Sequence, residues 1–433
     1  MRDYLELLQR NVNYRYLWWG NVVSLLGDWF TLIASASLIT ELTNSGVAIS
    51  YLFLARFLPL FLFSPLAGVL ADRYDRKKIM VVTDMLRAVI VWGFLLVGVT
   101  GQVWLFYLLT VAQFALSSLF TPARTAVLAM IVPEKDLVTA NALDSFTWST
   151  MLALGALLGG AVAAIFGDQT AFVLDGVTYL LSALLLVRIA LPKRPPRSVE
   201  TVEQSGWLDF VEGFKYVAGR PFLLGISLVK AGGSLVWGAI NVLEVKYAEE
   251  IFALARVGWL PNLRIEDPGT ATLGLIYLIS GLGTGLGPIF MRRWLGDSRR
   301  RLLQGIGVGF LLMLAGITGL AFAPALGIFL LFTFVRTVGT GTLWVFSAVL
   351  LQVMVPDAYR GRVFAFEFAA LTLTQSISIF AAGFAIDSLD WTAPQVMLSF
   401  AWLGVLVAVT WGVFYSINRS RPLPSSQEPT SLE

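Results

Sequence analysis

The stretch that decides the fold is Gly68-Val69-Leu70-Ala71-Asp72-Arg73-Tyr74-Asp75-Arg76-Lys77-Lys78, a short charged segment between two long apolar runs. A partial copy follows at Gly287 to Arg301, also between apolar runs. Hydrophobic residues make up 57% of the 433 residues and charged residues only 14%, whereas soluble domains average about 25% charged residues. The composition therefore indicates a membrane protein whose spanning helices are joined by short charged loops.

Apolar runs of about 20 residues, enough to cross a bilayer as a helix, recur along the whole chain. We expect spans at 16–40, 48–70, 79–99, 103–122, 142–166, 170–191, 221–247, 270–292, 302–322, 325–350, 363–386 and 394–417. No cleavable signal peptide is predicted, because the first residues lack an apolar core followed by a small-residue cleavage site.

Several classes of chemistry are excluded by what the sequence lacks. Without Cys there are no disulfides or thiolate metal sites, and without His a proton carrier has to be a carboxylate. The sequence has no phosphate-binding loop and no motif that pairs a nucleophile with a base. We therefore expect no enzyme activity, no cofactor, no metal and no nucleic-acid partner.

Lys and Arg gather in alternate loops, near residues 73–78, 193–220, 292–301 and 360–362. Because basic residues mark cytoplasmic loops, we expect these loops and both termini to be cytoplasmic in a multi-pass protein of the cell membrane. Both termini on one side require an even number of spans, which agrees with twelve.

A repeat of six helices is indicated by anchors that share one offset. Pro133 corresponds to Pro356 and Gly160 to Gly383, both 223 residues later (356 − 133 and 383 − 160). We expect two six-helix halves at 1–191 and 221–417, a cytoplasmic linker at 192–220 and a cytoplasmic tail at 418–433. The linker contains an amphipathic segment from Trp207, which is either a helix on the membrane surface or an extension of the next span.

The opening stretch resembles the signature loop of the major facilitator superfamily, Gly-x-x-x-Asp-Arg-x-Gly-Arg-Arg/Lys. The residues that match this pattern are Gly68, Asp72, Arg73, Arg76 and Lys77, whereas Asp75 stands where the pattern has glycine. The resemblance implies an all-α membrane fold of twelve helices in two pseudo-symmetric halves, with the loop as a cytoplasmic gate. We expect Asp72 and Arg76 to pair one turn apart on one helix, and Asp84 and Arg87 to join the gate. The alternative is that the basic residues only anchor the topology.

The start of the chain resembles the subfamily of macrolide-efflux-type and enterobactin-exporter-type proteins. The residues that carry this resemblance are Arg10-Asn11, Tyr14-Arg15, Leu17-Trp18 and Gly27-Asp28, with Thr83-Asp84, Arg87-Ala88, Asp175-Gly176, Tyr179 and Ser182. Gly155, Gly159 and Gly160 also resemble the antiporter motif of superfamily exporters, with Ala156 in place of its proline. In either case, glycines at this spacing let helices pack closely.

Polar residues form stripes at helical spacing on the first, fourth, seventh and tenth spans, which line the central cavity in the superfamily. The candidates for cavity lining are Asn21, Ser24, Thr31, Gln113, Ser117, Ser234, Asn241 and Thr340, with the nearby aromatic residues Trp237 and Trp344. Gln113 stands where the proton-coupled drug exporters carry an arginine. The alternative is that the polar residues join neighbouring helices.

Charges inside spans cost about 2.5–3.5 kcal/mol each and usually have a function. Asp28 is the expected proton carrier, and Lys230, Arg336 and Glu367 are expected to complete the coupling site. The alternative for Asp28 is a structural ion pair.

The sequence thus predicts a monomeric transporter, with protons, a small-molecule substrate and the bilayer as its partners. It is expected to export amphipathic, drug-like molecules. The alternatives are a siderophore or lysolipid exporter, and a membrane sensor that no longer transports.

Overall fold

The computed structural model describes the whole chain except residues 1, 134–135, 192–205, 254–266, 297 and 420–433. The described residues form helices joined by short connections, and none of them lies in a strand. Twelve of the described helical segments are long and apolar enough to cross a membrane. The predicted all-α class and the predicted number of spans are confirmed.

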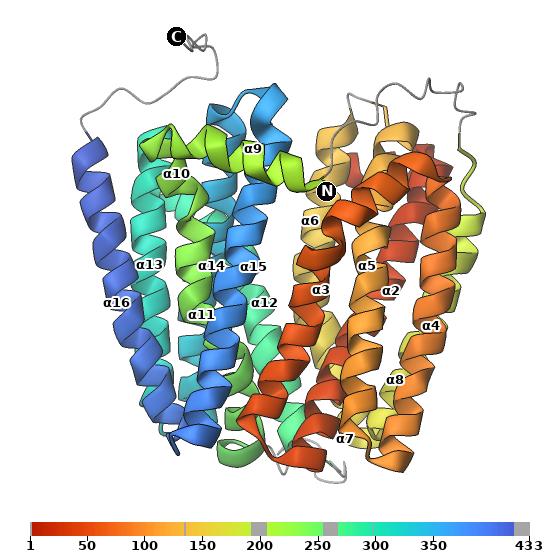
Figure 1. Cartoon of the computed structure of the whole chain (residues 1–433), viewed down its shortest axis with the longest axis horizontal. Coiled ribbons are helices and arrows are strands. Elements are labelled where there is room, and N and C mark those ends of the chain that lie inside the picture. The colour runs from red at the N-terminus through yellow and green to blue at the C-terminus, as the bar shows by residue number, and fades with distance from the viewer. Residues whose placement is uncertain (1, 134–135, 192–205, 254–266, 297, 420–433) are drawn as a thin grey trace. The chain divides into compact units, whose positions relative to one another are not determined.

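The spans and two additional helices follow one another along the chain (Figure 1). In order they are α1 (Arg2–Arg10), α2 (Val12–Thr43), α3 (Gly46–Arg73), α4 (Arg76–Thr100), α5 (Val103–Ile131), α6 (Leu137–Thr150), α7 (Ala156–Phe166), α8 (Asp168–Val187), α9 (Gly206–Ala218), α10 (Pro221–Ser227), α11 (Val229–Lys246), α12 (Pro268–Leu295), α13 (Arg299–Ala321), α14 (Leu326–Met354), α15 (Asp357–Ser388) and α16 (Ala393–Asn418). A π-helical turn at Met151–Gly155 joins α6 to α7, and a second at Tyr247–Ile251 extends α11.

The internal repeat extends to the local structure of α5 and α14. Their first residues and their last residues are both 223 apart (326 − 103 and 354 − 131). The residues that end them, Val132 and Val355, have nearly the same backbone angles, φ −102° and ψ 126° against φ −96° and ψ 126°. Both valines precede the prolines that first indicated the repeat. The residue before a proline is confined to extended conformations, which accounts for the shared backbone angles.

The contacts within the chain divide it into two compact units. Unit 1 comprises Met1–Gly206 with Glu244–Leu278, and unit 2 comprises Trp207–Leu243 with Ile279–Glu433. These units differ from the predicted division at residues 191 and 221, because the described residues on either side of 254–266 contact the end of α2 and α7. The Nζ of Lys246 donates to the carbonyl of Asn44 at 3.3 Å, and the amide of Asp267 donates to the carbonyl of Ala164 at 3.3 Å.

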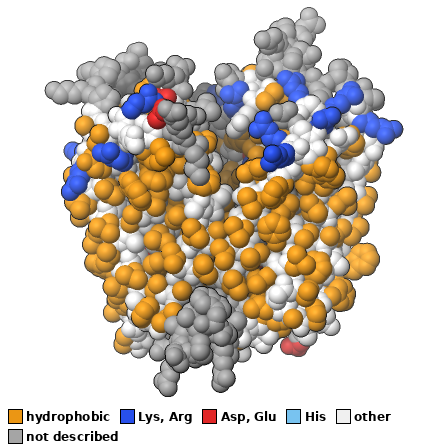
Figure 2. Space-filling view, turned by 180° about the vertical axis from the view of Figure 1, so that it is seen from behind, with side chains coloured by type: hydrophobic (Ala, Val, Ile, Leu, Met, Phe, Trp, Pro, Cys, Tyr) orange, Lys and Arg blue, Asp and Glu red, His pale blue; other side chains and the backbone are white. Residues whose placement is uncertain are grey.

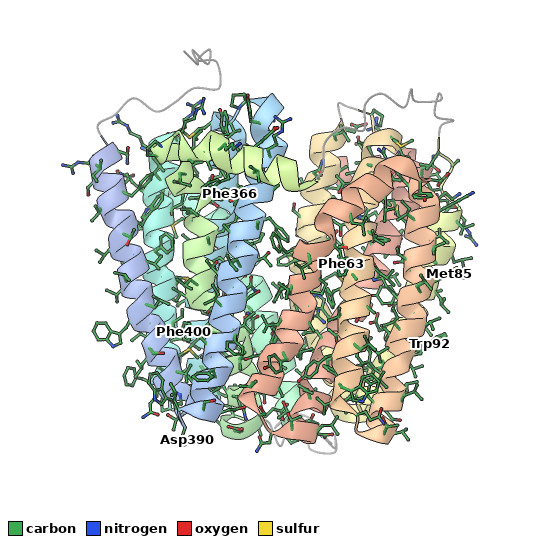
Figure 3. All side chains as sticks on the ribbon, viewed as in Figure 1. Phe63, Met85, Trp92, Phe366, Asp390 and Phe400 are labelled. Atoms are coloured by element: carbon green, nitrogen blue, oxygen red, sulfur yellow. The ribbon has the colours of Figure 1, made fainter. Side chains whose placement is uncertain are left out.

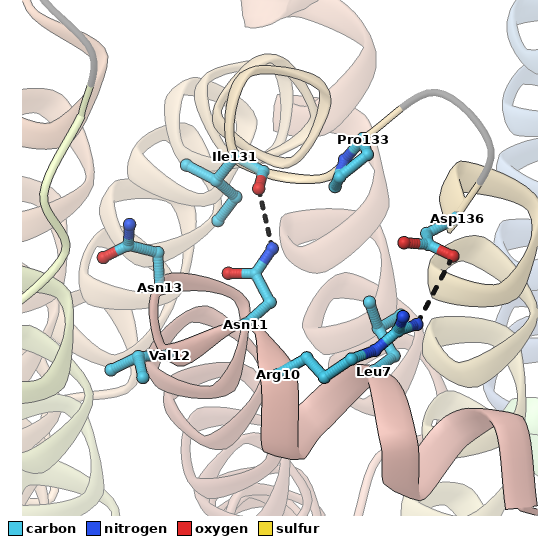
Figure 4. Close-up of a pocket in the computed structure, with 8 residues that line it drawn as sticks. All are labelled: Leu7, Arg10, Asn11, Val12, Asn13, Ile131, Pro133 and Asp136. Carbon is cyan, nitrogen blue, oxygen red and sulfur yellow. Dashed lines mark hydrogen bonds and ion pairs between the residues drawn. The ribbon is translucent and has the colours of Figure 1, made fainter.

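Within unit 1, the corner between α1 and α2 is tied to α5 and α6. The Oδ1 of Asn11 caps α2 by accepting from the amide of Tyr14 at 2.9 Å, and its Nδ2 donates to the carbonyl of Ile131 at 2.7 Å (Figure 4). The hydroxyl of Tyr14 donates to the carbonyl of Ala140 at 3.1 Å. Arg10 lies 3.9 Å from Asp136 across a hollow of about 440 Å³. The N-terminal residues that carried the subfamily resemblance therefore have structural roles here.

The signature loop is a tight turn between α3 and α4. Asp75 caps α4, because its Oδ1 accepts from the amide of Lys78 at 2.9 Å. With φ −64°, Asp75 needs no glycine, which accounts for the departure from the superfamily pattern. The prediction that Asp72 and Arg76 share one helix is wrong, because α3 ends at Arg73 and α4 begins at Arg76.

In unit 2, α13 packs against α14 and α16, while α10 packs against α14 and α15. The helix α9 is separate from the following span, so the alternative of a simple extension is wrong. Figure 1 shows α9 lying across the ends of α10 and α15, with Gly213 against the backbone of Arg362. Val211 and Phe214 are exposed, as a helix at a membrane surface requires. The side chains of Trp207 and Phe210 lie outside the described residues.

The surface of each unit is divided by polarity along the helix axes. Hydrophobic side chains cover the sides of the helices, whereas Lys and Arg gather at one end (Figure 2). Met85, for example, is 51% exposed and projects outward from α4 (Figure 3). Large apolar side chains exposed in such numbers fit contact with lipid rather than with water.

We expect Gly160→Ala to destabilise unit 1, because a Cβ at this position would lie 2.8 Å from the Cα of Gly274 on α12. Overpacking of this kind costs about 1–3 kcal/mol. The melting temperature of the detergent-purified protein should fall. Gly412→Ala on α16 is the matched control, since nothing lies within 4 Å of a Cβ built there. Equal melting temperatures for the two variants would show that α7 and α12 do not need this close approach.

Candidate functional site

A buried polar cluster lies in unit 1 where α2, α4 and α8 meet. We call it the Asp28 network, and its members are Asp28, Asp84, Arg87, Asp175 and Tyr179. Arg87 Nη1 lies 3.1 Å from Asp84 Oδ1, and Arg87 Nη2 lies 3.6 Å from Asp28 Oδ1. One guanidinium thus contacts carboxylates from two different helices, α2 and α4.

Helix α8 supplies hydroxyl groups to the same carboxylates. The Tyr179 hydroxyl donates to Asp28 Oδ1 and accepts a hydrogen bond of 3.1 Å from Nε2 of Gln113. The Ser182 hydroxyl donates to Asp84 Oδ2 at 2.7 Å. The Tyr179 ring also packs against the guanidinium, with Arg87 Cζ 4.3 Å from its centroid. Each charged oxygen of the Arg87–Asp84 pair therefore has a hydrogen-bond donor.

Asp175 is the most enclosed acid of the network. It is fully buried and accepts hydrogen bonds from Thr31 at 2.5 Å and from Thr178 at 3.1 Å. In the same unit, the guanidinium of Arg56 on α3 packs over the ring of Phe114 at 4.5 Å. Asp175 is thus stabilised by two hydroxyl groups, one from α2 and one from α8.

The side chains of the Asp28 network differ in how far they are exposed. The side chain of Asp28 is 23% exposed, against 6% for Arg87 and none for Asp84. Asp28 is therefore the acid of the Arg87 pairs that water or a substrate can reach. Arg87 stabilises its position and its charge, and Asp84 holds Arg87 in place.

A second charged cluster lies in unit 2. Lys230 on α11 forms an ion pair with Glu367 on α15, with Nζ 3.0 Å from Oε2, and both side chains are almost fully buried. The Lys230 ammonium also lies 4.5 Å from the ring centroid of Trp344 on α14. The third predicted member, Arg336, instead places Nη2 3.4 Å from the hydroxyl of Ser280 on α12. The structure thus joins Lys230 and Glu367 directly and directs Arg336 toward α12.

Three of the predicted cavity residues are used for helix contacts instead. Thr31 contacts Asp175, Gln113 contacts Tyr179, and Ser234 contacts Thr374 at 2.6 Å, and each of the three is at most 1% exposed. Their assignment to an open cavity surface is corrected, because each bonds to a neighbouring helix. Ser24 is also buried, whereas Asn21, Ser117, Trp237, Asn241, Thr340 and Trp344 retain exposed surface.

The predicted gate residues divide between two places. Lys77 Nζ donates to the carbonyl of Ile189 at 2.7 Å, and Arg76 Nη1 lies 3.6 Å from the sulfur of Met130, so both attach the loop to neighbouring helix ends. Asp84 and Arg87 belong to the Asp28 network instead. The surroundings of Gly68 and the side chains of Asp72 and Arg73 are not among those that the structure describes.

The glycines of the predicted packing motif lie against α2. A Cβ on Gly155 would be 2.9 Å from Trp29 Cδ1, and one on Gly159 would be 3.0 Å from the Trp29 carbonyl. The following residue of the motif, Gly160, meets α12 as described above. No group of three or more carboxylates able to hold a metal ion occurs in the described part of the chain.

Tyr179 and Ser182 were seen in the sequence only as marks of resemblance. Their spacing also predicts a shared polar face. Steps of four and three residues place three side chains on one side of a helix, here Asp175, Tyr179 and Ser182. The partner of that face, Asp84 with Arg87 on α4, shows the same kind of step.

Comparisons with known proteins agree with this architecture. The family model described as Major Facilitator Superfamily matches residues 17–263. The putative bacilysin exporter BacE of Bacillus subtilis (strain 168) is 26% identical over 407 residues, 94% of each chain. Macrolide efflux protein A of Streptococcus pyogenes is 25% identical over 380 residues, 86% of this chain and 88% of that protein. The crystal structure of the nucleoside transporter NupG has a similar fold, with a TM-score of 0.69, 15% identity and coverage of 94% and 99%.

We expect Asp84→Asn to destabilise the protein, because it leaves the buried Arg87 with only the more distant Asp28. Removing one partner of a buried pair costs about 3–5 kcal/mol, and the melting temperature in detergent should fall accordingly. The double variant Asp84→Leu with Arg87→Met should regain part of the loss, since both buried charges are removed and only the partly exposed Asp28 loses an ion-pair partner. Asp390→Asn, at an exposed helix end, should change nothing. A double variant less stable than Asp84→Asn would contradict this account.

Proposed function

This chain belongs to the Major Facilitator Superfamily, and on that premise we propose that it exports amphipathic small molecules in exchange for protons. It is a multi-pass membrane transporter with efflux-type relatives. The observation that carries the proton coupling is the position of Asp28, a partly exposed carboxylate that shares the guanidinium of Arg87 with the buried Asp84.

The network supports reversible protonation at Asp28. When Asp28 is protonated, Arg87 remains paired with Asp84 at 3.1 Å, so no buried charge loses its partner. When Asp28 is ionised, the Tyr179 hydroxyl and Arg87 stabilise its negative charge. Arg87 therefore keeps a partner in either state of Asp28, which supports Asp28 as the proton carrier.

Exchange follows if a substrate and a proton favour opposite states of Asp28. Binding of the substrate then promotes release of the proton, and rebinding of a proton promotes release of the substrate. A proton and a substrate that favour opposite states of one carrier, which opens to each side of the membrane in turn, produce antiport.

The proposal also includes the direction of transport and the orientation of the chain in the membrane. Export is supported by two relatives, a macrolide efflux protein and a putative bacilysin exporter. We place the chain in the cell membrane, with its basic loops and both termini in the cytoplasm. The loop with Gly68, Asp72, Arg73, Arg76 and Lys77 then lies on the cytoplasmic side and acts as the gate there.

The proposal predicts that Asp28→Asn abolishes substrate-dependent proton release from energised inside-out vesicles. The amide is close to the carboxyl group in size but cannot exchange a proton, so coupling should fall to background. Macrolides are the first substrates to test, followed by siderophores and lysolipids.

Asp136→Asn is the matched control, because this acid lies near Arg10 at 3.9 Å and outside the network. Proton release that persists unchanged in Asp28→Asn would remove Asp28 as the carrier. Absence of proton release with every compound in the native protein would favour a sensor that no longer transports.

A further inference from the structure

The Lys230–Glu367 pair has more hydrogen-bonding capacity than the surrounding protein uses. Among the described residues, Lys230 donates one hydrogen bond, 3.0 Å to Glu367 Oε2, although an ammonium has three donors. Glu367 is 2% exposed, and its other oxygen, Oε1, is buried without a hydrogen-bond partner. A buried carboxylate oxygen without a donor is costly. The pair thus has an open acceptor on one side and open donors on the other.

The pair is not needed to hold α11 against α15. The Ser234 hydroxyl donates to the carbonyl of Leu371 at 3.1 Å, and the amide of Ala239 donates to the Ser378 hydroxyl at 2.8 Å. These uncharged bonds join the same two helices further along their length. Apolar residues in place of a buried ion pair are often neutral or stabilising. The two charges therefore indicate a ligand rather than a structural contact.

Charge balance selects the class of that ligand. A cation that binds Glu367 takes the place of Lys230 and leaves a buried ammonium unpaired. An anion that binds Lys230 leaves the Glu367 carboxylate unpaired in the same way. A molecule that carries both charges, an ammonium and a carboxylate a few bonds apart, pairs with both residues and leaves neither exposed to the apolar interior.

Trp344 offers a ligand access to the Lys230–Glu367 pair and an apolar surface to pack against. Its ring covers one side of the Lys230 ammonium at 4.5 Å, yet the residue itself is 45% exposed. A change of the Trp344 rotamer uncovers that side of the pair. The same ring can then pack against the apolar body of a bound molecule and can contact its ammonium as it now contacts that of Lys230.

We infer that Lys230, Glu367 and Trp344 bind the zwitterionic head group of the exported molecule, so that substrates of amino-acid or short-peptide type are preferred. The inference rests on the proposed export function and specifies its substrate class. The substrate ammonium pairs with Glu367, including the open Oε1, and the substrate carboxylate pairs with Lys230. Proton exchange at Asp28 belongs to the other unit and is separate from this recognition.

Three small molecules that share one phenyl ring test the inference in the purified full-length protein. L-phenylalanine carries both charges, 2-phenylethylamine only the ammonium, and 3-phenylpropanoate only the carboxylate. A ligand that binds the folded state raises the melting temperature as its concentration rises. We expect L-phenylalanine to do so with an apparent affinity at least tenfold tighter than either analogue.

Variants assign the effect to the site. Glu367→Gln should abolish the response to L-phenylalanine, and Trp344→Ala should weaken it. The double variant Lys230→Met with Glu367→Leu removes both charges together, so it should fold and still fail to respond. Glu212→Gln is the matched control, because Glu212 pairs with Arg362 at 3.0 Å on a more exposed surface of the same unit.

The inference is overturned if either analogue stabilises the protein as well as L-phenylalanine does, if the double variant still responds, or if L-phenylalanine has no effect. Proton release with macrolides, lost in Asp28→Asn, tests the export function independently. Such release without any response to L-phenylalanine would refute the zwitterion site alone. A response to L-phenylalanine without proton release for any compound would instead refute the export function.

Discussion

Arg87 has to be neutralised where it lies, because it is 5% exposed among apolar helices. An isolated charge in such surroundings is too costly to keep, so its position determines what surrounds it. Asp84 comes from the same helix one turn away, Asp28 comes from α2, and the hydroxyl groups of Tyr179 and Ser182 come from α8. The relative rotation of three helices is therefore tied to one guanidinium. The same arrangement leaves Asp28 as the exposed acid of the set.

The two charged clusters stabilise their buried charges in different ways. In unit 1 two acids share the guanidinium of Arg87, so Arg87 keeps a partner whatever the state of Asp28. In unit 2 a single lysine faces a single glutamate, and neither can change its state without affecting the other. A shared network suits the movement of a proton. A closed pair suits recognition of a ligand that brings a matching pair of charges.

Close backbone contact is the second constraint on unit 1. Gly155 and Gly159 bring α7 and the preceding π-helical turn against Trp29 and Phe30 on α2, and Gly160 brings α7 against Gly274 on α12. Side chains at these positions would separate the helices. Because α12 touches α7 in this way, residues 244–278 belong to unit 1 although they follow residues of unit 2 in the sequence.

The sequence by itself determined the class of protein, the number of spans and the superfamily, because hydropathy and loop charge depend on composition and order alone. It also identified Asp28, Lys230 and Glu367, since a charge in an apolar run is visible without a structure. Only the tertiary structure decided which charges meet, since helix rotation and packing are not encoded in periodicity. Asp84 and Arg87 were expected at the gate and lie with Asp28, and Thr31, Gln113 and Ser234 bond to neighbouring helices instead of lining a cavity. A polar face on a helix has to avoid lipid, but whether it meets water or another helix depends on partners that lie 66 to 144 residues away in the chain.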